Sequence, residues 1–536
     1  MTQPDALMPP MKWNAWGDPN AAKPLSEGIR SLLKQALGVA EEPAPELDAE
    51  QVRLRPSALS ENDRQALSGI VGADHLRIGD HDRLLHAGGK STLDLLRRKD
   101  SGEQDAPDAV LLPGSEDEVA AILQHCSQRG IAVVPFGGGT SVVGGLDPIR
   151  GVFDAVVSLD LRRFDQLLDF DEVSGEAEFG AGVTGPVAER LLGERGFSLG
   201  HFPQSFEFAS IGGFAATRSS GQNSAGYGRF DDMIGGLRVI TPAGVLDLGR
   251  APASAAGPDL RQLLIGSEGV FGVITRVRVR VHPTPEAIRY EAWSFPDFAT
   301  GTAALRAVAQ TGTGPTVIRL SDEAETGVNL ATTETIGESQ VTGGCLAITV
   351  FEGTAEHAES RHAETHALLA ARGGTSLGEG PAHAWERGRF GAPYLRDSLL
   401  AAGALCETLE TATTWSNIPA LKTAVTEALT GALGESGTPA LVLCHISHVY
   451  ASGASLYFTV VAGQRGNPID QWRKAKAAAS DAIVAAGGTI THHHAIGADH
   501  RPWMHDEVGD LGVRILQAVK STLDPAGILN PGKLIP

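Results

Sequence analysis

The stretch Pro135-Phe136-Gly137-Gly138-Gly139-Thr140-Ser141-Val142-Val143-Gly144-Gly145-Leu146 decides the fold of this chain. Apolar runs at 131–136 and 152–159 flank it, so we expect a loop between two strands. The loop holds five glycines within nine residues. Because glycine lacks a Cβ and tolerates positive φ, successive peptide N–H groups can converge on an anion. The stretch therefore favours a diphosphate-binding loop, with a flexible surface loop as the alternative.

The composition is that of a globular chain with more than one domain. It has 536 residues, of which 42% are hydrophobic and 20% charged, and this length exceeds what one core usually supports. The formal net charge of −20 argues against electrostatic binding of nucleic acid. Neither a secretory signal nor an apolar run of membrane-spanning length is visible, so we expect a cytoplasmic protein. Four widely spaced cysteines form no CxxC pair and are expected to be buried and free: Cys126, Cys345, Cys406 and Cys444.

Strand and helix patterns alternate in the first half of the chain. Ser115 and Glu118 form a predicted capping box, and Gly130 ends the helix that it opens. The stretch 201–228 has little periodicity and many small residues, which is typical of a functional irregular segment. The other predicted elements are strands at 109–112, 131–136 and 273–281, a helix from Thr184 to Arg195, and a hairpin of 237–241 with 245–248.

Dense glycine loops end near Pro285, where we place a domain boundary. The polar region 321–345 is predicted to be a mobile loop, and Ser26 to Leu37 a helix closed by Gly38. Trp13 and Trp16 suggest an arm that docks on the body of the protein. Further elements are predicted as strands at 346–351, 441–446 and 456–461, a helix at 471–486 and a linker at 41–46. The expected segments are an N-terminal arm and helical part (1–100), a cofactor domain (101–285) and a cap domain (286–490). A C-terminal segment (491–536) is expected to complete the active site and the cofactor domain.

The glycine-bearing loops match neither a Walker A loop nor a GxGxxG helix start. In order, PFGGGTSVVGGL, PQSFEFASIGGFAATRSSGQNSAGYG and IGSEGVFGVIT resemble the FAD-binding domain of the vanillyl-alcohol-oxidase superfamily. Together with MKWNAWG, VIRLSDE, YLRDSLL, GASLYF and GGTITHHHAIG, the chain more closely resembles the alkyldihydroxyacetonephosphate synthase family. The resemblance implies an α+β fold with a two-subdomain FAD-binding domain and an α+β cap domain.

The same motifs imply which residues hold FAD. Where covalent relatives often carry a histidine, this chain has Thr140, so the resemblance implies non-covalent FAD. The implied cofactor residues are Pro135, Phe136, Gly137, Gly138, Gly139, Thr140, Ser141, Pro203, Gln204, Ser205, Phe206, Glu207, Phe208, Ala209, Gly212, Ala216, Thr217, Arg218, Ser219, Glu268, Gly269, Val270, Phe271, Gly272, Val273 and Ile274.

The resemblance assigns the chemistry to the cap. Without it, a tyrosine in a strand is more often a packing residue, and adjacent histidines more often form a surface or metal-binding run. With it, Tyr457 is a proton donor, the run of His492, His493 and His494 is required, and Arg396 binds the substrate phosphate, with Arg319 as a second basic candidate. The implied reaction exchanges the acyl chain of acyl-dihydroxyacetone phosphate for a fatty alcohol without net redox change.

Two other interpretations stay open. An FAD-dependent oxidase or dehydrogenase of a hydroxy acid or alcohol is the main alternative, and a non-catalytic flavin-binding protein is the third. Metal-dependent dehydrogenases of the superfamily carry HxGDGNxH and EHG, whereas this chain has HVYASGASLYF and HHHAIG, so we predict no metal. His445, His448, His493 and His494 can nevertheless converge on an ion. We also expect a homodimer, with peripheral membrane contact left open.

Overall fold

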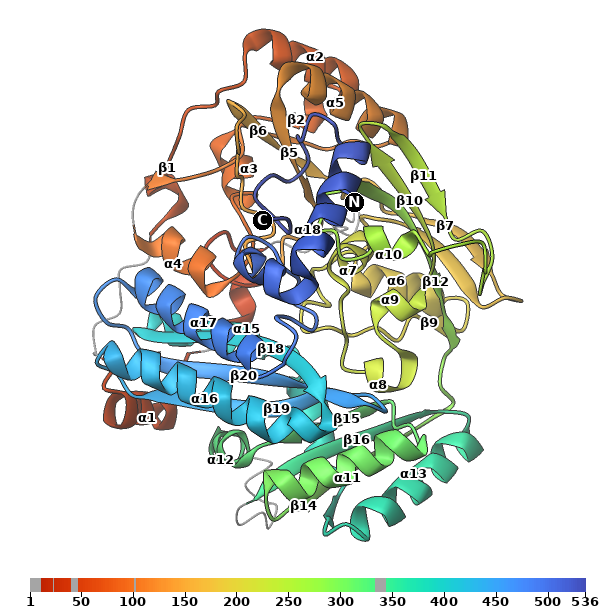
Figure 1. The fold of residues 1–536 in the computed structure, drawn as a ribbon, viewed down its shortest axis with the longest axis vertical. Coiled ribbons are helices and arrows are strands. Elements are labelled where there is room, and N and C mark those ends of the chain that lie inside the picture. Colours follow the sequence, from red (N-terminus) through yellow and green to blue (C-terminus); the bar gives the residue numbers. More distant parts are fainter. Residues whose placement is uncertain (1–10, 23, 40–46, 101–102, 333–343) are drawn as a thin grey trace.

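The computed structural model describes residues 11–22, 24–39, 47–100, 103–332 and 344–536. Three sheets of four, five and seven strands organise these residues beside two sheets of two strands each, and the α+β fold class is confirmed. Figure 1 shows the four- and five-stranded sheets in the upper half of the view and the largest sheet in the lower half. Within the described part of the chain, no helix has the length and apolar composition needed to cross a membrane.

The first sheet carries the glycine-rich loop. Its order is β2 (Leu76–Arg77), β4 (Ala109–Leu111), β6 (Ala155–Asp160) and β5 (Ile131–Phe136), and β6 pairs parallel to both β4 and β5. Helix α5 (Glu116–Arg129) connects β4 to β5 and packs on α2 (Glu61–Val71). As predicted, the Ser115 hydroxyl accepts from the Glu118 N–H at 3.2 Å, and Gly130 ends the helix with φ of 65°.

The second sheet is antiparallel and lies beside the first. Its order is β11 (Gly244–Leu248), β10 (Ile234–Thr241), β12 (Val273–Arg280), β8 (Glu176–Gly180) and β7 (Leu167–Asp171). The predicted hairpin is β10 with β11, and the predicted helix after Thr184 is α6 (Gly185–Gly193). The stretch expected to be irregular contains a short helix, α7 (Ile211–Thr217), because the Ser210 hydroxyl caps the Gly213 N–H at 3.2 Å.

The third sheet has seven antiparallel strands. Their order is β17 (Thr375–Gly378), β14 (Ala287–Phe295), β16 (Cys345–Gly353), β15 (Val317–Ser321), β19 (Ala440–Val449), β20 (Gly453–Gly463) and β18 (Ala404–Thr414). Helices α11 (Phe298–Thr311), α13 (Ala355–Ala370), α16 (Ile418–Glu435) and α17 (Pro468–Ala485) cover one face (Figure 1). Side chains alternate along a strand, so Phe458 and Val460 pack into the core while Tyr457 and Thr459 point to the opposite face.

The prediction of a loop at 321–345 was wrong at its start, where the acid-rich segment forms α12 (Glu323–Thr332). The remainder of that prediction, 333–343, and the predicted linker at 41–46 lie outside the described residues. Helix α1 (Glu27–Leu37) forms as predicted, with Ser26 as its N-cap and Gly38 at φ of 59°. Trp13 and Trp16 are buried at 9% and 5% exposure, so the arm docks as expected.

The C-terminal segment returns to the first sheet. Helix α18 (Met504–Leu523) precedes a bridge between Leu529 and Val133 of β5. The remaining helices and strands are α3 (Asp80–Leu85), α4 (Thr92–Asp100), α8 (Ser224–Tyr227), α9 (Phe230–Met233), α10 (Arg261–Leu264), α14 (Gly380–Gly388), α15 (Ala392–Ala401), β1 (Arg53–Leu54), β3 (Glu103–Gln104), β9 (Phe197–Ser198) and β13 (His282–Pro283). All four cysteines are buried and free, as predicted.

Candidate active site

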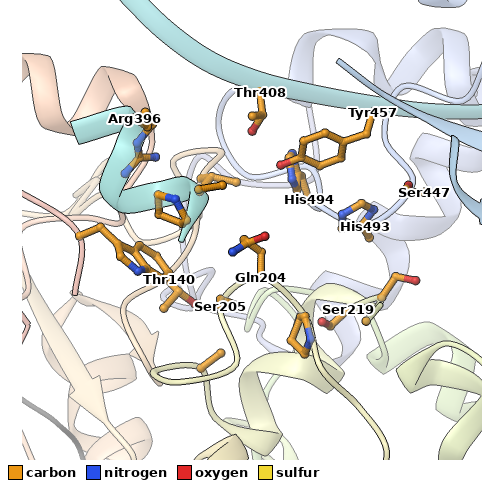
Figure 2. A pocket seen from close by; sticks show the side chains of 18 of the residues that line it. Thr140, Gln204, Ser205, Ser219, Arg396, Thr408, Ser447, Tyr457, His493 and His494 are labelled. Atoms are coloured by element: carbon orange, nitrogen blue, oxygen red, sulfur yellow. The ribbon is translucent and has the colours of Figure 1, made fainter. Parts of the chain in front are cut away.

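A cavity of about 670 Å³ lies between the glycine-bearing loops and the seven-stranded sheet (Figure 2). The sheet contributes alternate residues of its strands, among them Leu443 and His445 of β19 and Tyr457 of β20. Their neighbours Cys444, Ile446, Leu456 and Phe458 belong to the core beneath the helices. The period of two thus brings polar side chains from four strands, β15, β18, β19 and β20, to one wall of the cavity.

The glycine-rich loop needs its glycines for close packing against a second loop. A Cβ on Gly138 would lie 2.0 Å from the carbonyl oxygen of Phe208, and one on Gly137 would lie 2.5 Å from the Ser210 hydroxyl. Both distances are far inside van der Waals contact, so a larger residue would push the loops apart. The two predicted cofactor segments therefore form one continuous surface.

Most of the predicted cofactor residues line this cavity. They are Pro135, Phe136, Gly137, Gly138, Gly139, Thr140, Ser141, Pro203, Gln204, Ser205, Ala209, Gly212, Ala216, Thr217, Ser219, Glu268, Gly269, Gly272 and Ile274. The other seven do not line it: Phe206, Glu207, Phe208, Arg218, Val270, Phe271 and Val273. Phe271 and Val273 belong to the core beneath the second sheet, and Arg218 instead pairs with Asp231 at 2.9 Å.

Three buried polar atoms along the cavity have no hydrogen-bond partner within the described chain. They are Gln204 Nε2, Ser220 Oγ and Gln222 Oε1. Leaving such groups unpaired costs about 1–3 kcal/mol each, so a ligand with both donors and acceptors is expected to contact them. The flavin ring system has both, and the adjacent glycine loop offers peptide N–H groups to a diphosphate. The residues present therefore fit FAD.

Glu268 connects the cofactor loops to the C-terminal segment. Its carboxylate accepts from the Gly497 N–H at 2.8 Å and the Ile496 N–H at 3.1 Å. Burial raises the pKa of Glu268 to about 7, against the opposing effect of these donors. The predicted cofactor residue is thus also a structural tie beneath the cavity.

The three consecutive histidines are held by a buried carboxylate. Glu410 of β18 accepts the backbone N–H groups of His492, His493 and His494 at 2.6, 3.1 and 2.9 Å. Burial favours the neutral acid, but the imidazoles and the Thr491 hydroxyl outweigh it and hold the pKa of Glu410 well below its usual range. The ionised carboxylate fixes the backbone that presents the imidazoles.

Tyr457 lies among these histidines. Its ring is 5.6 Å from that of His494 and 6.0 Å from that of His493, and its hydroxyl side faces Thr408 and the cavity (Figure 2). Burial raises the pKa of Tyr457 and lowers that of both histidines. At neutral pH the tyrosine therefore keeps its proton, while each imidazole is neutral and has one unprotonated ring nitrogen.

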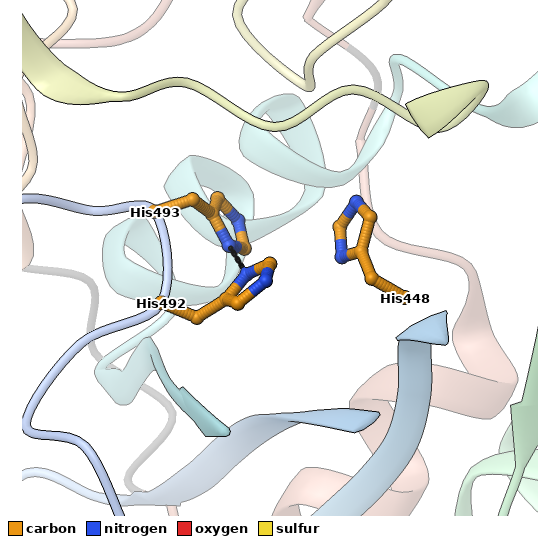
Figure 3. A group of neighbouring side chains, drawn as sticks. All are labelled: His448, His492 and His493. Carbon is orange, nitrogen blue, oxygen red and sulfur yellow. Dashed lines mark hydrogen bonds between the residues drawn. The ribbon is translucent and has the colours of Figure 1, made fainter. Parts of the chain in front are cut away.

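The structure places His492 slightly apart from the other two. It does not line the cavity; its Nε2 meets the Tyr450 hydroxyl at 2.6 Å and its Nδ1 meets His493 Nδ1 at 2.9 Å. His448 completes this group (Figure 3), and the nearest ring nitrogens of His448, His492 and His493 lie within 4.8 Å of one another. His445, named as a possible ligand from the sequence, instead meets Glu325 at 2.8 Å.

Arg396 and Arg319 both line the cavity and both are partly engaged. Arg396 Nη1 donates to the Lys90 carbonyl at 2.7 Å, and its Nε and Nη2 donate to Asp397 at 3.1 and 3.0 Å. Each terminal nitrogen of Arg396 thus keeps one N–H for a ligand within the described surroundings. Arg319 donates to Glu325 at 2.7 Å, and the pKa of Glu325, which burial alone would raise, falls to about 2 beside His445 and Arg319.

One part of the cavity is apolar and was not predicted. Helix α1 lines it with Ile29, Leu32, Leu33 and Leu37. Leu33 and Leu37 pack in one cluster with Leu399 and Val461, which also line the cavity. The helix was predicted from the sequence, but a partner for its apolar face was not.

Glu410 and Glu325 were also missed by reasoning from the sequence. Both are acidic residues that the fold buries, at 2% and 8% exposure. Glu410 and Glu407 are the two acids of β18, whose other residues are uncharged, and acids within such a strand are the signal that could have marked Glu410.

The fold and the cavity define an FAD-linked enzyme with a separate sheet that lines the cavity. Residues 107–249 match the family described as FAD binding domain, and residues 284–534 match FAD linked oxidases, C-terminal domain. The chain belongs to the alkyldihydroxyacetonephosphate synthase family. It is 33% identical to alkyldihydroxyacetonephosphate synthase of Trypanosoma brucei brucei, over 98% of this chain and 92% of that one.

Further relatives agree with this placement. The chain is 31% identical to alkyldihydroxyacetonephosphate synthase of Dictyostelium discoideum, over 98% of this chain and 93% of the relative. A solved structure of an alkyldihydroxyacetonephosphate synthase superposes with a TM-score of 0.84 at 29% identity, covering 98% of this chain and 99% of that one. The predictions of family and of FAD as cofactor are confirmed.

Proposed function

We propose that this protein exchanges the acyl chain of acyl-dihydroxyacetone phosphate for a fatty alcohol. The observation that carries the proposal is that one cavity joins three regions of different chemistry: the glycine-bearing loops, the cluster around Tyr457, and the apolar part lined by α1. The named relatives support the same reaction. A reaction that uses a flavin, a proton donor and a substrate with a long chain needs all three regions.

Each region has a role in the proposal. The Tyr457 hydroxyl donates a proton, and the imidazoles of His493 and His494 accept one from the incoming alcohol. The two free N–H groups of Arg396 bind the substrate phosphate, with Arg319 as a second cation in the same cavity. The apolar residues of α1 cover the chain, which buries methylenes at about 0.8 kcal/mol each.

The bound flavin would supply a nucleophilic ring nitrogen and would end the cycle in its starting oxidation state. The acyl group leaves as a carboxylate, and the oxygen of the fatty alcohol becomes the ether oxygen. We further propose that FAD is held without a covalent bond, because Thr140 offers no side chain that would form one. A cytoplasmic homodimer that meets its lipid substrates at a membrane surface fits this chemistry.

The experiment is to incubate purified holoenzyme with acyl-dihydroxyacetone phosphate and hexadecanol and to detect the ether product by mass spectrometry. The proposal expects product only when both substrates are present. The alternative, an oxidase or dehydrogenase, expects instead that a hydroxy acid or alcohol alone reduces the flavin. Reduction of that kind, with no ether product, would replace the proposal.

A further inference from the structure

A second group of metal-ligating side chains lies away from the cavity. Glu291 comes from β14, and His362 and His366 come from α13, which covers the same end of the seven-stranded sheet. His362 Nε2 lies 3.0 Å from Glu291 Oε2, and His366 Nδ1 lies 2.9 Å from Glu291 Oε1. None of these three residues lines the cavity described above.

The arrangement follows from the helix and the strand. Residues four apart lie on one helix face, so both imidazoles of α13 point to the strand beneath. The Glu291 side chain is 7% exposed, whereas those of His362 and His366 are 24% and 47% exposed. A buried carboxylate at the base and two imidazoles toward solvent form a site that an ion can enter from outside.

Among the described residues, no lysine or arginine pairs with the Glu291 carboxylate to balance its negative charge. The ion-pair partners of Glu291 within the described chain are these two histidines alone, and neither carries a fixed charge. The Ser376 hydroxyl of β17 adds one neutral hydrogen bond to Oε1 at 2.5 Å. Burying a carboxylate without a compensating charge is costly, and a bound cation removes that cost.

We propose that Glu291, His362 and His366 bind a divalent transition-metal ion, with Zn²⁺ as the best match. Their three ligand atoms lie within 4.8 Å of one another, so small side-chain rotations bring each to a coordination distance of about 2.0–2.2 Å. Two imidazoles and one carboxylate suit zinc rather than Mg²⁺ or Ca²⁺, which prefer oxygen ligands. Water or the Ser376 hydroxyl completes the coordination.

Such an ion would join α13 to β14 and, through Ser376, to β17. An ion that binds the folded chain and not the unfolded one stabilises the fold by mass action. The site is therefore structural, and the melting temperature rises with added Zn²⁺ while the cavity chemistry does not depend on it.

The test measures zinc bound by the full-length holoenzyme after chelator treatment and transfer to metal-free buffer. Calorimetric titration with ZnCl₂, and metal analysis after gel filtration, give the number of ions per chain. We expect His362→Ala/His366→Ala to bind one ion fewer than wild type. Glu291→Gln, which keeps the shape of the side chain, should lose the same ion even if the double variant folds poorly. His357→Ala, an exposed histidine of α13, should bind as wild type does.

The cluster of His448, His492 and His493 is a second group that can bind zinc. Because the variants alter only the Glu291 group, the ion that they lose is the one bound by Glu291, His362 and His366. Equal zinc binding by wild type and both variants would place the ion elsewhere and overturn the proposal. Absence of zinc binding by wild type would overturn it as well. A local readout comes from Trp293, whose ring is 5.0 Å from that of His366. Co²⁺ should quench its fluorescence in wild type and leave it unchanged in Glu291→Gln.

Discussion

The ring of Tyr457 stacks on the imidazole of His445, with centroids 5.0 Å apart and planes inclined by 20°. His445 is in turn held by Glu325, which also binds Arg319. The two rings lie opposite each other on β20 and β19, where Tyr457 and His445 are register partners. The orientation of the proposed proton donor is therefore set by the sheet and a buried ion pair rather than by a loop.

Tyr457→Phe should reduce kcat by about 10²–10⁴-fold, because the substitution removes the proton donor and keeps the stacked ring. Steady-state turnover measures the loss. FAD content and melting temperature should stay near wild type, since one hydrogen bond contributes only about 1 kcal/mol.

The matched control is Tyr290→Phe, which removes a hydroxyl that donates to Glu386 at 2.8 Å and lies outside the cavity. It should leave kcat unchanged. If Tyr457→Phe keeps more than about a tenth of wild-type kcat, Tyr457 is a packing residue, because its loss falls below the catalytic range.

Glu410→Gln should destabilise the histidine segment. The substitution keeps the shape but removes the charge that accepts three backbone N–H groups, and hydrogen bonds to a charged group contribute about 1.5–3 kcal/mol each. We expect a lower melting temperature together with a loss of turnover. Glu507→Gln is the control, because Glu507 binds the neighbouring Ile490 N–H at 2.9 Å but lies exposed on the surface. Equal effects of the two variants would contradict the role given to Glu410.

Stability should fall as the pH drops from about 6.5 to about 4, in part through His448. Burial lowers the pKa of His448 from 6.5 to about 4 in the folded chain. In that window the unfolded chain binds a proton that the folded chain does not, so the free energy of unfolding decreases with falling pH, by at most about 1.4 kcal/mol per pH unit for one group. Denaturant unfolding of His448→Gln should show a shallower dependence than wild type. Identical pH profiles would refute this assignment.

Arg396→Lys should raise the KM for the phosphate-bearing substrate by about 10–100-fold, because a lysine keeps the charge and loses the paired N–H groups. Loss of one or two charge-assisted hydrogen bonds accounts for that range. The KM for the fatty alcohol should change little. A variant in which kcat falls and both KM values stay constant would show that Arg396 only supports the fold through Asp397 and Lys90.

The sequence predicted what depends on local pattern. The N-cap at Ser115 and the strand into the glycine loop both follow from such local signals. Helix α12 was missed because Gly and Thr obscure its acidic first turn. Such patterns do not predict contacts between residues that are far apart in the sequence.

Two of those contacts build the cavity and its surroundings, and a third forms the proposed zinc site. Glu410 meets the histidines 82 to 84 residues later, α1 lines a cavity formed mostly by residues after 134, and Glu291 meets α13 more than 70 residues on. No local propensity encodes these pairings, because tertiary packing selects them. Of the seven predicted cofactor residues that do not line the cavity, Val270, Phe271 and Val273 share its loops but point into the core.

The central claim is that chain exchange needs no net oxidation or reduction. The direct measurement is ether product formed under strict anaerobiosis, without dye or other electron acceptor, counted against enzyme-bound FAD over many turnovers. The account predicts that product continues to accumulate far beyond the amount of FAD and that the flavin spectrum at the end equals that at the start. Product that stops at one equivalent per flavin, or that forms only in proportion to an added acceptor, would contradict it.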